Sequence, residues 1–122
     1  HQLIAQQVRT VIRNKTFYEV TQADTGESWR WPGQLWHAAG FASLLLYGVF
    51  GLAYDRDGMT FAPAASQAFD GAQVRGLRYR EAVLDLELRG HGTLARVLLD
   101  DRPVRIVPAD TVGRHMVVLE LR

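Results

Sequence analysis

Apolar residues in the first part of the chain recur at the spacing of a helix. Between Gln2 and Asn14 they occupy one side of such a helix, at Leu3, Ile4, Val8, Val11 and Ile12. The opposite side carries Gln6, Arg9 and Arg13. The pattern therefore predicts an amphipathic helix over residues 2–14.

A second helix is predicted to begin after Pro32, because proline suits the first turn of a helix, where its missing N–H has no partner to lose. Its apolar residues continue to about Leu52, at Leu35, Trp36, Ala39, Ala42, Leu45, Leu46 and Val49. Residues 35–53 contain no Asp, Glu, Lys or Arg, and His37 is their one histidine. Their glycines, and the lack of an asymmetry of flanking basic residues and of an aromatic belt at both ends, argue against a membrane span. We expect a helix that is buried on most sides.

The segment between these helices, residues 15–31, is rich in Thr, Asp, Gly and Ser and contains a predicted turn at Ala23–Gly26. It is longer than a minimal connection between two helices needs to be. Long ordered loops of this kind frequently carry function. This segment is therefore a candidate location for a functional site.

The pattern changes near Asp55, from helical spacing to strict alternation. In the segment Val83–Arg89, leucines alternate with charged residues, which indicates a strand with one buried and one solvated face. The turns between several strands are predicted at Gly90–Gly92 and Asp100–Pro103. The predicted strands are Met59–Phe61, Gln73–Tyr79, Val83–Arg89, Thr93–Leu99, Val104–Val107 and Met116–Leu121. Their number and spacing favour a small antiparallel β-sandwich or sheet.

The sequence thus predicts an α+β chain, with a helical hairpin over residues 1–54 and an antiparallel β-domain over residues 55–122. Two helices, one of them apolar almost all round, cannot cover both of their faces by packing on each other. The helical pattern is already under way at His1, with no signal peptide before it. We interpret the chain as a fragment whose helices pack against another segment or another protomer.

Composition narrows the classes of function. Hydrophobic residues make up 48% and charged residues 22%, as in globular proteins. The net charge of +1 supplies no overall field that would gather nucleic acid or an anionic membrane, so neither partner is expected. The absence of cysteine excludes disulfides and thiolate chemistry. His37, His91 and His115 lack the spacing of metal ligands, and we expect no metal and no cofactor.

The candidate chemistry lies in and just after the segment 15–31. Glu19 precedes a Thr-Gly turn. After the turn come Trp29, Trp31 and Trp36, three tryptophans within eight residues. Sugar rings present apolar faces that pack on aromatic side chains, while their hydroxyl groups need fixed hydrogen-bond partners. Hydrolysis of a glycosidic bond requires two carboxyl groups, of which one acts as acid and the other as base or nucleophile. This combination of residues favours a carbohydrate site.

The motifs Tyr18-Glu19, Asp24-Thr25-Gly26 and Trp36-His37-Ala38-Ala39 resemble the closing helical hairpin of the six-hairpin, or (α/α)6-barrel, glycoside hydrolases. The nearest pattern is that of the processing α-glucosidase I group and its bacterial glucosidase and mannosylglycerate-hydrolase relatives. The stretch Leu46–Pro63, which ends in Gly58–Pro63, likewise resembles the hinge into the C-terminal β-domain of such enzymes. The resemblance implies hydrolysis of α-linked glucosides or oligosaccharides, with inversion and without a cofactor.

The same resemblance assigns roles to individual residues. It implies that Glu19 is the general base, and that Tyr18, Trp31 and Trp36 bind the substrate. The general acid of these enzymes comes from a hairpin far upstream, so we expect this chain to be inactive alone. Its expected partners are a carbohydrate and the remainder of the catalytic domain, or another protomer.

Other interpretations of the same residues remain open. Glu19 at a helix end or in a loop can instead pair with Arg13 or Lys15, and the tryptophans can instead fill a core. The whole chain then becomes a non-catalytic accessory module that stabilises a helical partner or binds sugar weakly. A third interpretation is a homodimer that forms through the apolar second helix.

Overall fold

The computed structural model describes residues 2–22 and 24–122. The chain divides into two compact units, His1–Leu44 and Leu45–Arg122. Strands account for 42% of the structure and helical residues for 26%, arranged as three sheets and two short α-helices. The predicted fold class is therefore wrong, because the described residues are mostly β and form no barrel-end helical hairpin.

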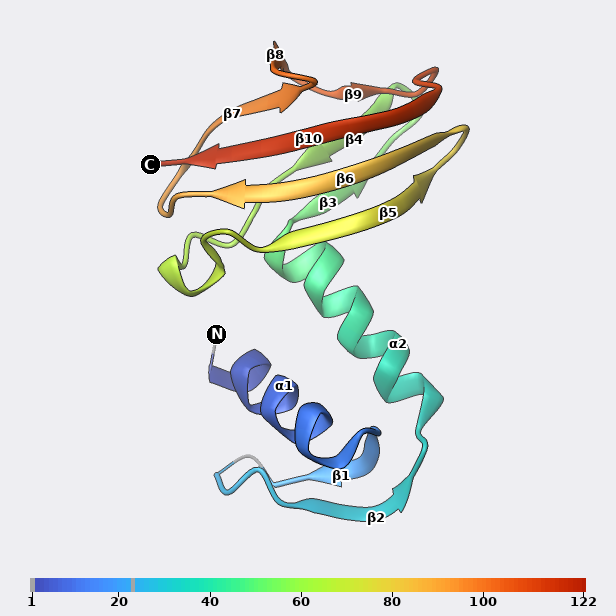
Figure 1. Ribbon diagram of the computed structural model, residues 1–122, viewed down its shortest axis with the longest axis vertical. Helices are drawn as coiled ribbons and strands as arrows, with labels where there is room; N and C mark the ends of the chain where they lie inside the picture. Colours follow the sequence, from blue (N-terminus) through green and yellow to red (C-terminus); the bar gives the residue numbers. More distant parts are fainter. Residues whose placement is uncertain (1, 23) are drawn as a thin grey trace. The chain divides into compact units, whose positions relative to one another are not determined.

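The first unit begins with helix α1, Gln2–Asn14, which confirms the helix predicted over this range. Strands β1, Tyr18–Thr21, and β2, Ser28–Pro32, follow as an antiparallel hairpin (Figure 1). The sequence predicts a loop over residues 15–31, and this prediction is wrong for the two strands. Both strands contain the β-branched and aromatic residues that strands favour. Asp24 and Thr25 lie in the turn, whereas Ala23, the first residue of the predicted turn, lies outside the described residues.

The β1–β2 hairpin occupies the segment that was predicted to connect two helices. Pro32 pairs with Tyr18 at the end of β2 and is not in the first turn of a helix. Helix α2 starts later, at Leu35–Ser43, and continues as the π-helix η1, Leu44–Val49. In the π-helical stretch the N–H of Phe50 donates to the carbonyl oxygen of Leu45 at 3.1 Å, a five-residue step.

The second unit contains a five-stranded sheet in the order β5-β6-β10-β7-β8. Its strands are β5 (Gln73–Tyr79), β6 (Ala82–Arg89), β7 (Leu94–Leu99), β8 (Arg102–Val104) and β10 (Gly113–Leu121). The last strand inserts between β6 and β7, parallel to β6 and antiparallel to β7 (Figure 1). The sheet is therefore mixed, and the prediction that it is wholly antiparallel is wrong. The predicted turn at Gly90–Gly92 suggested that β6 and β7 pair with each other as a hairpin. In the structure β10 lies between them.

A smaller sheet of the same unit has the order β3-β4-β9, with β3 at Leu52–Tyr54, β4 at Gly58–Phe61 and β9 at Val107–Pro108. The strand predicted over Val104–Val107 is wrong, since β8 ends at its first residue and β9 begins at its last. The ring of Tyr54 in β3 stacks on that of Tyr79 in β5, with 6.0 Å between centroids. The two sheets therefore lie against each other, as in a small β-sandwich.

The core lies in the second unit. Leu84, Leu86 and Leu88 of β6 are almost completely buried, which confirms the alternation read from the sequence. Further fully buried side chains come from both sheets and from η1, namely Val49, Met59, Val107, Val117, Val118 and Leu119. Burial of each such side chain contributes about 1.5–3 kcal/mol, and the unit therefore has a hydrophobic core of its own.

The first unit lacks such a core. Thr10 is its one buried side chain among residues 2–22 and 24–44. Several large apolar residues of α1 and α2 are exposed in this chain, namely Leu3, Val8, Ile12, Leu35 and Trp36. The expectation that the second helix is buried on most sides is therefore wrong for its α-helical part. Among the described residues, no helix is both long enough and apolar enough to span a bilayer.

Candidate functional site

Helix α1 is attached to the hairpin through its polar side. Three side chains at four-residue spacing lie on that side, because four residues make slightly more than one turn. Each donates a hydrogen bond: Gln6 to the carbonyl oxygen of Gln22 at 3.0 Å, Thr10 to that of Gly26 at 3.3 Å, and Asn14 to the hydroxyl of Ser28 at 2.8 Å. Val8 and Ile12, on the other side of the helix, remain exposed.

A groove of about 670 Å³ lies along this junction, within the first unit. Arg9 and Arg13 of α1 line it together with residues of the hairpin. The hairpin contributes the two aromatic rings of Tyr18 and Trp29 and the carboxylates of Asp24 and Glu27. Trp29 is 61% exposed, so its ring is accessible to a ligand. The groove thus combines charges of both signs with aromatic surface.

Glu19 lies beside the groove residue Tyr18, at an irregularity in the hairpin. The register between β1 and β2 shifts between Tyr18 and Val20, so that Glu19 faces the two residues Arg30 and Trp31 on β2. Arg30 has a φ of 63°, in the left-handed region that non-glycine residues seldom adopt. Bulges of this kind redirect side chains and are over-represented beside functional sites.

Glu19 is half-buried. None of the ion pairs formed by the described residues involves it, so the alternative pairing with Arg13 or Lys15 does not occur among them. Glu19 is not among the residues that line the groove.

The predicted substrate-binding residues lie in different places. Tyr18 lines the groove, whereas Trp31, 73% exposed, does not. Trp36, 65% exposed, lines a separate hollow of about 290 Å³ beside Phe41. Its ring lies edge-on to that of His37, with 6.2 Å between the centroids. The structure therefore brings Tyr18 to Trp29, and places Trp31 and Trp36 elsewhere on the first unit.

Sequence reasoning did not select the charged residues of the groove. Arg9, Arg13, Asp24 and Glu27 are unremarkable as isolated surface residues. The polar side of the first helix was the one signal in the sequence that could have led to the two arginines. On that side Gln6, Thr10 and Asn14 repeat every four residues. A polar stripe that regular is typical of a helix side that forms specific contacts.

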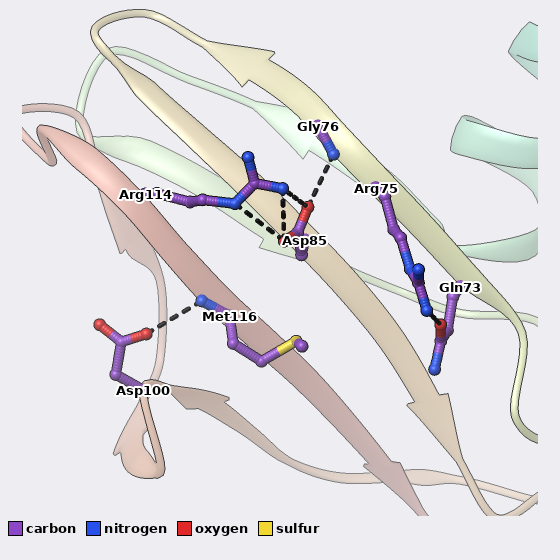
Figure 2. Close-up of polar contacts among 7 residues, drawn as sticks. All are labelled: Gln73, Arg75, Gly76, Asp85, Asp100, Arg114 and Met116. Carbon is purple, nitrogen blue, oxygen red and sulfur yellow. Dashed lines mark hydrogen bonds and ion pairs between the residues drawn. The ribbon is translucent and has the colours of Figure 1, made fainter.

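In the second unit, several charged side chains form ion pairs with one another on the five-stranded sheet. Figure 2 shows Arg114 of β10 contacting both oxygens of Asp85 on β6, while the N–H of Gly76 donates to the same carboxylate at 2.7 Å. These bonds, with that from Gly76 as the largest cause, lower the pKa of Asp85. Other cross-strand or same-strand pairs join Arg89 to Glu87 and Arg96 to Glu120. These carboxylates are already paired and belong to the architecture of the sheet.

Metal ligation is not indicated for the part of the chain that the structure describes, where no three His, Asp or Glu side chains come together as a group.

Comparison with known proteins adds no assignment. No protein-family model matches this chain, and no curated protein matches it. The resemblance to six-hairpin glycoside hydrolases therefore rests on the short motifs in the sequence.

Proposed function

We propose that this chain is part of a glycoside hydrolase that acts on α-linked glucosides or related oligosaccharides, and that residues 18–37 form part of its sugar-binding surface. The observation that carries the proposal is the exposure of all three tryptophans, Trp29, Trp31 and Trp36, in the same short segment as Glu19. Exposed indole rings are costly to leave in water and offer flat apolar surface to a ring of C–H groups.

In this proposal Glu19 acts as the general base. A base in an inverting enzyme activates a water molecule on the face of the sugar opposite to the leaving group. None of the ion pairs of the described residues involves Glu19, and its strand is irregular at this position, opposite Arg30 and Trp31. The general acid comes from another segment of the enzyme, about 6.5–9.5 Å from the base.

The exposed apolar side of α1 supports a role within a larger assembly. Its polar side is occupied by hydrogen bonds to the hairpin, while Val8 and Ile12 on the opposite side are 37% and 61% exposed. A soluble amphipathic helix normally has the opposite arrangement. The remainder of a catalytic domain, or a second protomer, would cover this side.

The test is the replacement Glu19→Gln in the enzyme that carries this chain, with p-nitrophenyl α-glucoside as the substrate. We expect turnover to fall by about 10²–10⁴-fold, because a positioned general base contributes that much. The control is Glu81→Gln, at an exposed carboxylate of the second unit, which should leave turnover unchanged. Turnover of the Glu19 variant near the unmodified rate would overturn the assigned role.

A second candidate function is carbohydrate binding without catalysis. It is favoured by the groove itself, which is lined by Tyr18 and Trp29 but not by Glu19. In that case Trp29→Ala would weaken the binding of maltotriose, while Glu19→Gln would not, and no hydrolysis would be seen in the assembled protein.

A further inference from the structure

We propose that the groove of the first unit selects carbohydrates that carry an anionic group, and that Arg9 and Arg13 hold this group. The inference rests on the proposed sugar-binding function and adds the chemical class of the ligand. Its basis is the arrangement of charges on the two sides of the groove.

Arg9 and Arg13 are one helical turn apart on the same helix. Both line the groove, and α1 contains no acidic residue that would neutralise them. Like charges at this spacing destabilise a helix. Such a pair is therefore unfavourable by itself and becomes favourable when an anion lies between the two guanidinium groups.

The backbone that carries the two arginines is fixed. Thr10, next to Arg9, is 7% exposed and donates to the carbonyl oxygen of Gly26. Asn14, next to Arg13, donates to Ser28. Since both anchors adjoin an arginine, the backbone from which the two arginine side chains extend is held against the hairpin.

The carboxylates in the same groove do not occupy the arginines. Asp24 and Glu27 line it from the hairpin, yet the ion pairs among the described residues include neither Arg9 nor Arg13. The planar fork of arginine donors matches a carboxylate or a phosphate, which it can bind through two parallel hydrogen bonds.

The hairpin side of the groove suits the rest of a sugar. The carboxylates of Asp24 and Glu27 can accept hydrogen bonds from hydroxyl groups, and the exposed ring of Trp29 can pack on the C–H face. A neutral sugar would satisfy this side alone. A sugar with a carboxylate or phosphate group would satisfy both sides.

The experiment is a fluorescence titration of the whole chain, whose three tryptophans all lie in the first unit. The ligands are glucuronate, glucose 6-phosphate, glucose and inorganic sulfate. We expect one or both of the anionic sugars to bind at least about tenfold more tightly than glucose, with an affinity that falls as salt is added. The tighter of the two identifies the anionic group as carboxylate or phosphate.

The variant Arg9→Gln/Arg13→Gln should lose this preference and retain weak binding of glucose. Arg75→Gln/Arg78→Gln in the second unit is the matched control and should keep it. Circular dichroism shows whether each variant is folded. Should the double variant of α1 unfold, Arg9→Lys and Arg13→Lys preserve the charge and remove the fork, and each should lower the preference.

Equal binding of glucose and both anionic sugars would overturn the selectivity and leave the proposed sugar-binding function standing. Sulfate binding as tight as that of the sugars would also overturn it, because the groove would then recognise an anion alone. If glucose and both anionic sugars leave the fluorescence unchanged, the proposed selectivity of the groove is overturned, while the proposed hydrolase function is judged separately by Glu19→Gln in the enzyme that carries this chain.

Discussion

At the scale of single residues, His115 is the clearest case of a side chain whose protonation is set by its contacts. Its Nδ1 lies 2.6 Å from a carboxylate oxygen of Asp100, and its Nε2 lies 2.9 Å from the carbonyl oxygen of Val112. Only the doubly protonated ring donates to both acceptors. The hydrogen bond with Asp100 is the main cause that raises the pKa of His115, and the same bond is the main cause that lowers the pKa of Asp100.

This pair predicts a pH dependence of stability. The contribution of His115 is complete below its ordinary pKa of 6.5 and is lost as the pH rises through its raised folded value. The contribution of Asp100 is complete above its ordinary pKa of 3.8 and is lost as the pH falls through its lowered folded value. We therefore expect the pair to stabilise the second unit most between these two ordinary values. The gain is about 0.5 kcal/mol, because solvent screens a half-exposed pair.

The measurement is urea unfolding followed by circular dichroism at pH 5.5 and pH 9. His115→Gln should reduce the difference in unfolding free energy between the two conditions. His91→Gln, at an exposed position of the same unit, should preserve it. An unchanged difference in the His115 variant would show that the pair contributes nothing to stability.

At the scale of elements, the spacing of apolar residues predicted some helices and strands correctly and missed others. The periodicities of α1, β5 and β6 were readable because each has a polar and an apolar side over a full element. The β1–β2 hairpin was not readable in the same way, since it has few buried residues and its strands are short. The polar residues of α1 were correctly placed on one side, but the sequence does not say that this side contacts the hairpin.

The contact between α1 and the hairpin predicts the effect of a single replacement. Asn14→Ala removes the 2.8 Å hydrogen bond to Ser28 and should destabilise the first unit by about 1 kcal/mol. Hydrogen exchange of the α1 amides is the measurement, and faster exchange is expected. Gln2→Ala, at an exposed position of the same helix, is the control. Equal protection of α1 in both variants would contradict the role given to this bond.

At the scale of the whole molecule, the two units differ in what stabilises them. The second unit has a core drawn from both of its sheets, while the described part of the first has Thr10 as its one buried side chain. Apolar burial is the main favourable term in folding. The first unit should therefore be much the less stable of the two.

Denaturation of the isolated chain tests this difference directly. Tryptophan fluorescence reports on the first unit alone, because Trp29, Trp31 and Trp36 all belong to it. Circular dichroism in the β region is dominated by the second unit. We expect the fluorescence transition at a lower urea concentration than the dichroism transition. Coincident transitions would mean that the chain unfolds as one cooperative body.

The sequence by itself determined the features that depend on neighbours along the chain: the bounds of α1 and β5, the buried side of β6 and the cluster of aromatic residues near Glu19. Tertiary structure alone decided that β10 lies between β6 and β7, and that Tyr18 and Trp29 share a groove with Arg9 and Arg13. The physical reason is that periodicity shows which side of an element is apolar. Which strands pair, and which helix side meets which hairpin, depends on hydrogen bonds and packing between residues far apart in the chain.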